Sequence, residues 1–198
     1  MQSNYEFQPL KPSFYDQSTL QLAESLLGQV LVKETDEGTA SGIIVETEAY
    51  LGEGDQAAHS YKKRRTKRTE IMFQAPGHAY IYQMHTHRLV NIVSGEEGNP
   101  QAVLIRAVEP LAGIELMKKR RPVDKMTNLT SGPGKLTKAL GITMEDYGRK
   151  LFEPPLFIAK GKPSGEIVRG TRIGIDNSGE ARDYPYRFWV KGNPYVSR

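Results

Sequence analysis

Two glutamates and a tyrosine occupy every second position in the segment VETEAY at residues 45–50. Glu46, Glu48 and Tyr50 would share one face of a β-strand, because successive strand side chains point to opposite faces. A carboxylate beside apolar surface must be paired, protonated or functional, and two such glutamates could suggest the carboxylate pair of a glycosidase. The expected faces are Ile44, Glu46, Glu48 and Tyr50 on one side and Ile43, Val45, Thr47 and Ala49 on the core side.

One of the two glutamates is enough for such chemistry. Neighbouring positions on the same strand face lie only about 7 Å apart, so two carboxylates there repel each other. We select Glu48 as the stronger candidate and keep Glu46 as the alternative. A solvated strand edge without any function is the other interpretation of the pattern.

Further aromatic and histidine residues follow in the segment GHAYIYQMHTHRLVN at residues 77–91. Tyr80 and Tyr82 share a strand face and, with Tyr50, could hold a flat group by stacking, although core packing would also explain them. His85 and His87 would also share a face and could be ligands of a metal-dependent hydrolase. The chain has no cysteine, which excludes disulfides, thiolate zinc sites and iron–sulfur clusters.

Positive charge is concentrated in two short runs, although the formal net charge is only +4. The runs are KKRRTKR at residues 62–68 and KKRR at residues 118–121. Such clusters attract nucleic-acid phosphates through charge neutralisation and counterion release. Solvated loops, or a nucleic-acid-binding module without catalytic activity, are the alternatives.

The pattern of elements predicts a single α+β domain over residues 1–198, with a curved, mostly antiparallel β-sheet and flanking helices. We expect a helix after Ser18, a strand pair around the turn at residues 36–38, and further strands and short helices that do not alternate regularly. No apolar run approaches the roughly 20 residues that span a bilayer. We therefore expect a cytoplasmic protein without membrane association. We also expect a monomer.

Long segments of the chain resemble the alkyladenine DNA glycosylase family, also called 3-methyladenine or methylpurine DNA glycosylases. The resemblance extends in order from about residue 10 to the last residue. Its segments are VETEAYLGEGDQAAHS, MFQAPGHAYIY, VNIVSG, AVLIRAVEPLAGIE, SGPGKLTKALGI and RIGIDNSGEARDYPYRFWVKGNPYVS.

The resemblance implies a monofunctional DNA glycosylase without metal or cofactor that acts on double-stranded DNA and initiates base excision repair. It would flip a damaged purine, such as 3-methyladenine, 7-methylguanine, hypoxanthine or ethenoadenine, out of the duplex and hydrolyse its N-glycosidic bond. Glu48 would be the general base that activates water, with Arg106 as its companion. The implied base-binding residues are Tyr50 on one face of the base, His59 and Tyr82 on the other, and Asn91 against the exocyclic amino group of guanine.

The sequence differs from the family at the residue that fills the space left by the flipped nucleotide. Familiar members have a tyrosine shortly after the Tyr82 position, and here the segment is one residue shorter. His85 lies nearest that position and is the expected wedge, with His87 as the alternative. The first basic run, Lys62, Lys63, Arg64 and Arg65, would contact the DNA backbone.

Overall fold

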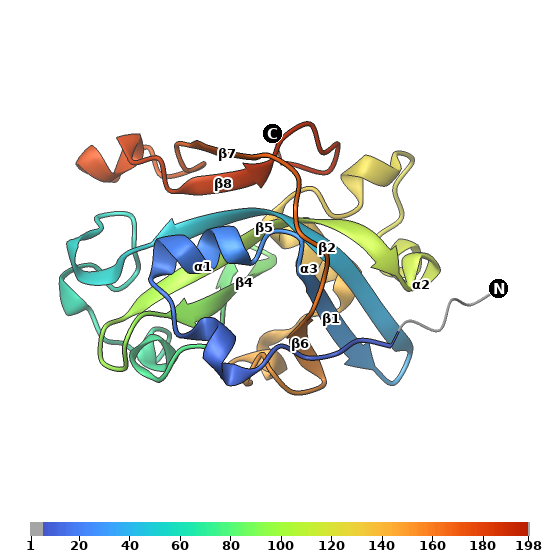
Figure 1. Ribbon diagram of the computed structural model, residues 1–198, viewed down its shortest axis with the longest axis horizontal. Coiled ribbons are helices and arrows are strands. Elements are labelled where there is room, and N and C mark those ends of the chain that lie inside the picture. Colours follow the sequence, from blue (N-terminus) through green and yellow to red (C-terminus); the bar gives the residue numbers. More distant parts are fainter. Residues whose placement is uncertain (1–5, 198) are drawn as a thin grey trace.

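The computed structural model describes residues 6–197, and Figure 1 shows a curled β-sheet with short helices packed around it. Within these residues eight strands form the sheet, and all of the strand pairs there are antiparallel. The strands are β1 Val30–Thr35, β2 Gly38–Tyr50, β3 Ala79–Met84, β4 His87–Ser94, β5 Gln101–Ala112, β6 Leu156–Ala159, β7 Ile167–Gly170 and β8 Arg187–Val190. The predicted single α+β domain is confirmed.

Three α-helices lie within residues 6–197: α1 Thr19–Ser25, α2 Ile114–Arg120 and α3 Pro133–Leu140. The Ser18 side chain accepts a hydrogen bond from the Gln21 amide, so Ser18 is the N-cap of α1, as predicted. Helix α1 packs on β2 and β5, whereas α3 packs on β4, β5 and α2. No helix within residues 6–197 has both the length and the apolar character needed to cross a membrane.

The strand order is β3-β4-β5-β2-β1-β6, and β8 pairs with β2 and with β7. Strand β2 therefore has two partners along one edge. Its first half pairs with β1 as far as Ile43, and the part from Glu46 to Glu48 pairs with β8. Strand β5 covers the other edge over both halves. The two glutamates thus lie inside the sheet, and the interpretation as a solvated edge is wrong.

Two bulges interrupt the pairing of β2 with β5 next to the glutamates. Glu46 pairs with Ala107, but the flanking register shifts leave Val45 on β2 and Arg106 on β5 without a partner in this ladder. A bulge moves the residues beyond it to the opposite face of the sheet.

The predicted faces of β2 are therefore wrong before the bulge and correct after it. Ile44 packs in the main core with Ala49, and Ile43 packs in a separate apolar cluster with Val30 and Val32. On β5 the second bulge lets Ile105 enter the core while Arg106 lines the cavity on the glutamate face.

Candidate active site

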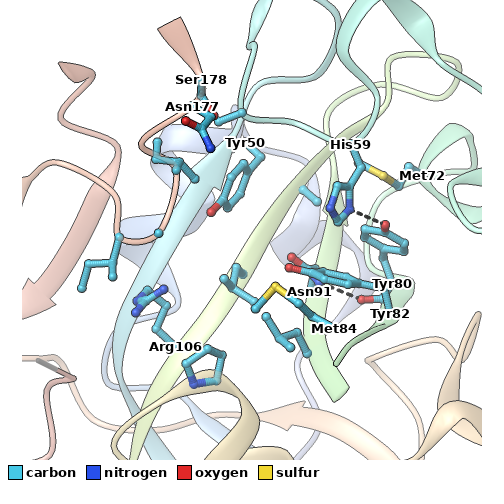
Figure 2. A pocket seen from close by; sticks show the side chains of 18 of the residues that line it. Tyr50, His59, Met72, Tyr80, Tyr82, Met84, Asn91, Arg106, Asn177 and Ser178 are labelled. Carbon is cyan, nitrogen blue, oxygen red and sulfur yellow. Dashed lines mark hydrogen bonds between the residues drawn. The ribbon is translucent and has the colours of Figure 1, made fainter. Parts of the chain in front are cut away.

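A cavity of about 450 Å³ lies on the glutamate face of the sheet and collects side chains from four strands, two loops and the start of α3 (Figure 2). A volume of this size is typical of pockets for small molecules and single bases. The predicted residues that line it are Tyr50 from β2, His59 from the following loop, Tyr82 from β3, Asn91 from β4 and Arg106 from β5.

Glu48 lies behind this lining and is fully buried. Its Oε2 accepts a hydrogen bond from the Tyr50 hydroxyl at 2.7 Å, and its Oε1 accepts one from the Ile173 backbone amide at 2.8 Å. The Arg106 guanidinium lies 3.3 Å from the same Oε1. A buried carboxylate held by these donors can stabilise positive charge that develops at the adjoining cavity wall.

Glu46 is buried as deeply as Glu48 but has a different set of partners. Its Oε1 accepts hydrogen bonds from Arg106 Nε at 2.9 Å, Arg187 Nε at 2.8 Å and the Ser197 hydroxyl at 2.8 Å. Its Oε2 accepts the Ser197 amide at 2.6 Å. Glu46 does not line the cavity, and its partners fix the position of Arg106, whose charge is shared between the two carboxylates.

The aromatic walls of the cavity stand on opposite sides, with Tyr50 on one side and His59 and Tyr82 on the other (Figure 2). The His59 and Tyr82 rings meet edge to face, with centroids 4.5 Å apart, and Tyr82 stacks on Tyr80 at 5.5 Å. The gap between the two walls has the shape needed to hold a planar group by stacking.

Burial fixes the protonation states of these walls. Burial, with the nearby charges of Arg68 and Arg64, lowers the pKa of His59 to about 4, so its ring is neutral at pH 7. Burial, with the negative charge of Glu48 and its hydrogen bond, raises the pKa of Tyr50 well above its usual value. Burial and the Glu48 charge raise the pKa of Tyr82 to about 12. Both phenols are therefore hydrogen-bond donors at neutral pH.

Asn91 lies on the cavity lining in the middle of β4 and is buried. Its Nδ2 donates a hydrogen bond to the Tyr80 carbonyl at 3.0 Å, across the pairing of β4 with β3. The Tyr80 hydroxyl in turn lies 2.7 Å from His59 Nδ1. The position of the Asn91 amide is thus fixed before any ligand enters.

The two candidate wedge histidines lie at the rim, in the hairpin between β3 and β4. His85 is exposed in the turn and has a positive φ of 53°. His87 is the first residue of β4 and packs so closely on α3 that a Cβ at Gly134 would come within 2.7 Å of it. Both histidines are exposed, but His85 lies in the turn itself, whereas His87 also packs against Gly134 of α3. Next to His85, Met84 is 49% exposed and also lines the cavity.

The histidines do not form part of a metal site in the described chain. Within residues 6–197, no group of three histidine, aspartate or glutamate side chains lies close enough together to hold a metal ion. The alternative of a metal-dependent hydrolase therefore has no ligand set in this part of the protein.

The first basic run lies in the loop between Tyr50 and β3, next to His59. Lys62 and Lys63 have positive φ values of 57° and 56°, which turn the chain sharply. Lys63 lies 3.3 Å from Glu53, and Arg65 makes a bidentate pair with Glu70. All four residues from Lys62 to Arg65 are exposed.

The second basic run bonds to other parts of the protein. In α2, Lys119 and Arg120 pair with Glu37 in the turn between β1 and β2, and Arg120 also donates to the Leu140 carbonyl. Arg121 donates to the Leu129 carbonyl. The bonds of these three side chains join α2 to the β1–β2 turn and to the chain around α3.

Sequence reasoning missed the segment at residues 173–178, which forms a wall of the cavity and supplies the Ile173 amide. Strand β7 ends at Gly170, so this wall lies in the loop that follows the strand. Sequence reasoning also missed the anchoring of Glu46 by Arg187 and Ser197. These contacts join residues more than a hundred positions apart, and no local pattern signals them.

The chain is similar over nearly its whole length to known proteins. The sequence profile of the Methylpurine-DNA glycosylase (MPG) family matches residues 13–194. A protein of Oceanobacillus iheyensis is 63% identical over 198 residues, covering 100% of both chains. A protein of Bacillus subtilis (strain 168) is 64% identical over 193 residues, which is 98% of each chain. A protein of Listeria monocytogenes serotype 4b is 49% identical over 188 residues, which is 94% of this chain and 91% of its own. All three relatives are named "Putative 3-methyladenine DNA glycosylase".

The family match and the names of the relatives place the chain in the DNA glycosylase class, whose members are hydrolases that act on N-glycosyl bonds. The chain belongs to the methylpurine-DNA glycosylase family.

Proposed function

We propose that this enzyme flips alkylated or deaminated purines out of double-stranded DNA and hydrolyses their N-glycosidic bonds. The expected substrates are 3-methyladenine, 7-methylguanine, hypoxanthine and ethenoadenine. The observation that supports this most directly is the burial of Glu48 behind a cavity with Tyr50 on one wall and His59 and Tyr82 on the other.

Glu48 is the general base in this proposal. As the bond from the sugar to the purine breaks, positive charge develops on the sugar, and the carboxylate both stabilises that charge and removes a proton from the attacking water. Arg106, at 3.3 Å, holds the carboxylate in place beside the cavity. The carboxylate has no exposed surface, and its partners Tyr50 and Ile173 both line the cavity that the nucleotide enters.

The flipped base lies between Tyr50 and the pair formed by His59 and Tyr82. Alkylated purines are electron-poor or cationic and stack well on phenol rings. The neutral His59 ring adds no positive charge against a cationic base. Asn91, held by the Tyr80 carbonyl, occupies the space that the 2-amino group of guanine would need.

The exposed residues around the cavity contact the duplex. His85 at the hairpin tip fills the gap that the flipped nucleotide leaves, and its exposure and position at the rim support this role. Lys62, Lys63, Arg64 and Arg65 contact phosphates beside the lesion. We propose that the enzyme works as a monomer without a metal or cofactor.

Single-turnover incubation with duplexes that each carry one lesion tests the proposal. We expect release of the free damaged base and an intact strand with an abasic site. Retention of this activity in a chelator would contradict a metal-dependent hydrolase, and binding without base release from any lesion duplex would favour the noncatalytic module and overturn the proposal.

A further inference from the structure

Arg172 precedes the cavity wall at residues 173–178, and its side chain is fully buried. The guanidinium makes a bidentate pair with Asp55, with distances of 2.5 and 2.8 Å. It also donates to the Ala49 carbonyl at 2.9 Å and to the Ala181 carbonyl at 3.0 Å. One side chain thus joins the end of β2, the following loop and the 3₁₀ helix Gly179–Asp183.

Asp55 extends this connection into the loop after β2. Its carboxylate accepts the Leu51 amide and the Ala57 amide, both at 3.0 Å, in addition to the two bonds from Arg172. Because Asp55 is also buried, the pair is largely protected from solvent screening. The loop that leads from Tyr50 to His59 is therefore fixed at its centre.

The Arg172 guanidinium also lies over the Tyr50 ring, with its central carbon 4.7 Å from the ring centroid. Tyr50 lines the cavity and Arg172 does not, so the guanidinium packs on the ring from outside the cavity. The next residue in the chain, Ile173, donates its amide to Glu48. Displacement of Arg172 would therefore disturb both the Tyr50 ring and one bond to Glu48.

We propose that Arg172 is a positioning residue that holds Tyr50 and the Ile173 amide in the arrangement that receives the flipped base. This inference rests on the proposed function, in which Tyr50 stacks on the base. A ring that is already fixed loses little conformational freedom when the base binds, which strengthens binding without any contact to the base.

Arg172→Lys tests the proposal, because lysine keeps the charge beside Asp55 but cannot provide the planar fork that reaches three acceptors and stacks on a ring. Asp55→Asn is a second variant, which weakens the bidentate pair with the same guanidinium by removing the charge of its partner. The matched control is Arg120→Lys, which removes a guanidinium that also bonds a carboxylate and a carbonyl, but in α2 and away from the cavity lining.

The measurement is a double-mutant cycle with Tyr50→Ala, in which affinity for a duplex containing ethenoadenine and the single-turnover rate of excision are both determined. Unfolding curves establish that each variant is folded at the assay temperature. A cation–π contact and its fixed geometry are worth up to about tenfold in binding, so we expect Arg172→Lys to weaken affinity by about tenfold when Tyr50 is present and by less than about twofold when it is alanine. Asp55→Asn should show the same dependence on Tyr50, and Arg120→Lys should leave affinity and rate unchanged.

Equal losses from Arg172→Lys with and without Tyr50, or a loss no greater than that from Arg120→Lys, would overturn the proposal. If the wild type released no base, the proposed function would fail. The affinity cycle would still decide whether Arg172 acts through Tyr50.

Discussion

Glu48→Gln separates the chemical role of the buried carboxylate from its structural role. The amide can keep its oxygen toward the Ile173 amide and Arg106, and its NH₂ group can donate to the Tyr50 hydroxyl, which then acts as the acceptor. Arg106 also keeps its bond to Glu46. Since every partner can still be satisfied, we expect a loss of only about 1 kcal/mol in the free energy of unfolding.

The same variant should be severely impaired in catalysis, because an amide cannot accept a proton from water. General-base assistance is typically worth about 10² to 10⁴-fold, and we expect a loss of that size in the single-turnover rate of base release. Affinity for a lesion duplex should remain close to that of the wild type, measured by fluorescence anisotropy. A rate of base release close to the wild-type rate would refute the assignment of Glu48 as the base.

Glu46→Gln is the matched comparison and should show the opposite behaviour. Both Glu46 oxygens face donors only, so no orientation of an amide satisfies Arg106, Arg187 and the Ser197 amide together. Removal of one partner from a buried charged cluster costs about 3 to 5 kcal/mol, which urea denaturation would detect. The folded fraction should retain more excision activity than Glu48→Gln, and the reverse order would exchange the two roles.

Further variants test the pocket, the rim and the loop. Asn91→Ser should admit bases with a 2-amino group, and an unchanged ratio of guanine-derived to hypoxanthine excision would contradict steric exclusion by Asn91. His85→Ala should weaken binding to a flipped-lesion duplex more than to an unmodified one, and a larger effect of His87→Ala would reassign the wedge. Arg64→Ala should reduce the logarithmic salt slope of DNA binding by about one. Arg65→Ala should reduce it less, because that guanidinium is already paired with Glu70, and equal slopes for both variants and the wild type would place the run away from the phosphates.

Strand alternation was a reliable guide only within short distances along the chain. It correctly placed Glu48 and Tyr50 side by side, because the two residues lie beyond the bulge and are separated by one strand repeat. It failed for Ile44, because the bulge at Val45 exchanges the faces of the strand. Sequence alone does not reveal that bulge, which depends on the register with β5.

Similar sequence patterns also have different environments in the structure. The two basic runs are equivalent as compositions, yet one is exposed beside the cavity and the other pairs with Glu37 and with carbonyl groups around α3. The two glutamates are equivalent as strand residues, yet Glu46 binds Ser197 and Glu48 binds Ile173. In each case the difference comes from contacts with residues that are distant in the sequence.

The sequence by itself therefore determined the kinds of group at the site: a carboxylate two residues before a tyrosine, further tyrosines on another strand, and a basic loop between them. Their local spacing follows from strand geometry, which is the same in any β-strand. Only the tertiary structure decided which carboxylate adjoins the cavity, which donors it has, and that Arg172 lies behind Tyr50. The physical reason is that hydrogen-bond partners and burial depend on long-range pairing, and that pairing minimises the free energy of the whole chain rather than of any one segment.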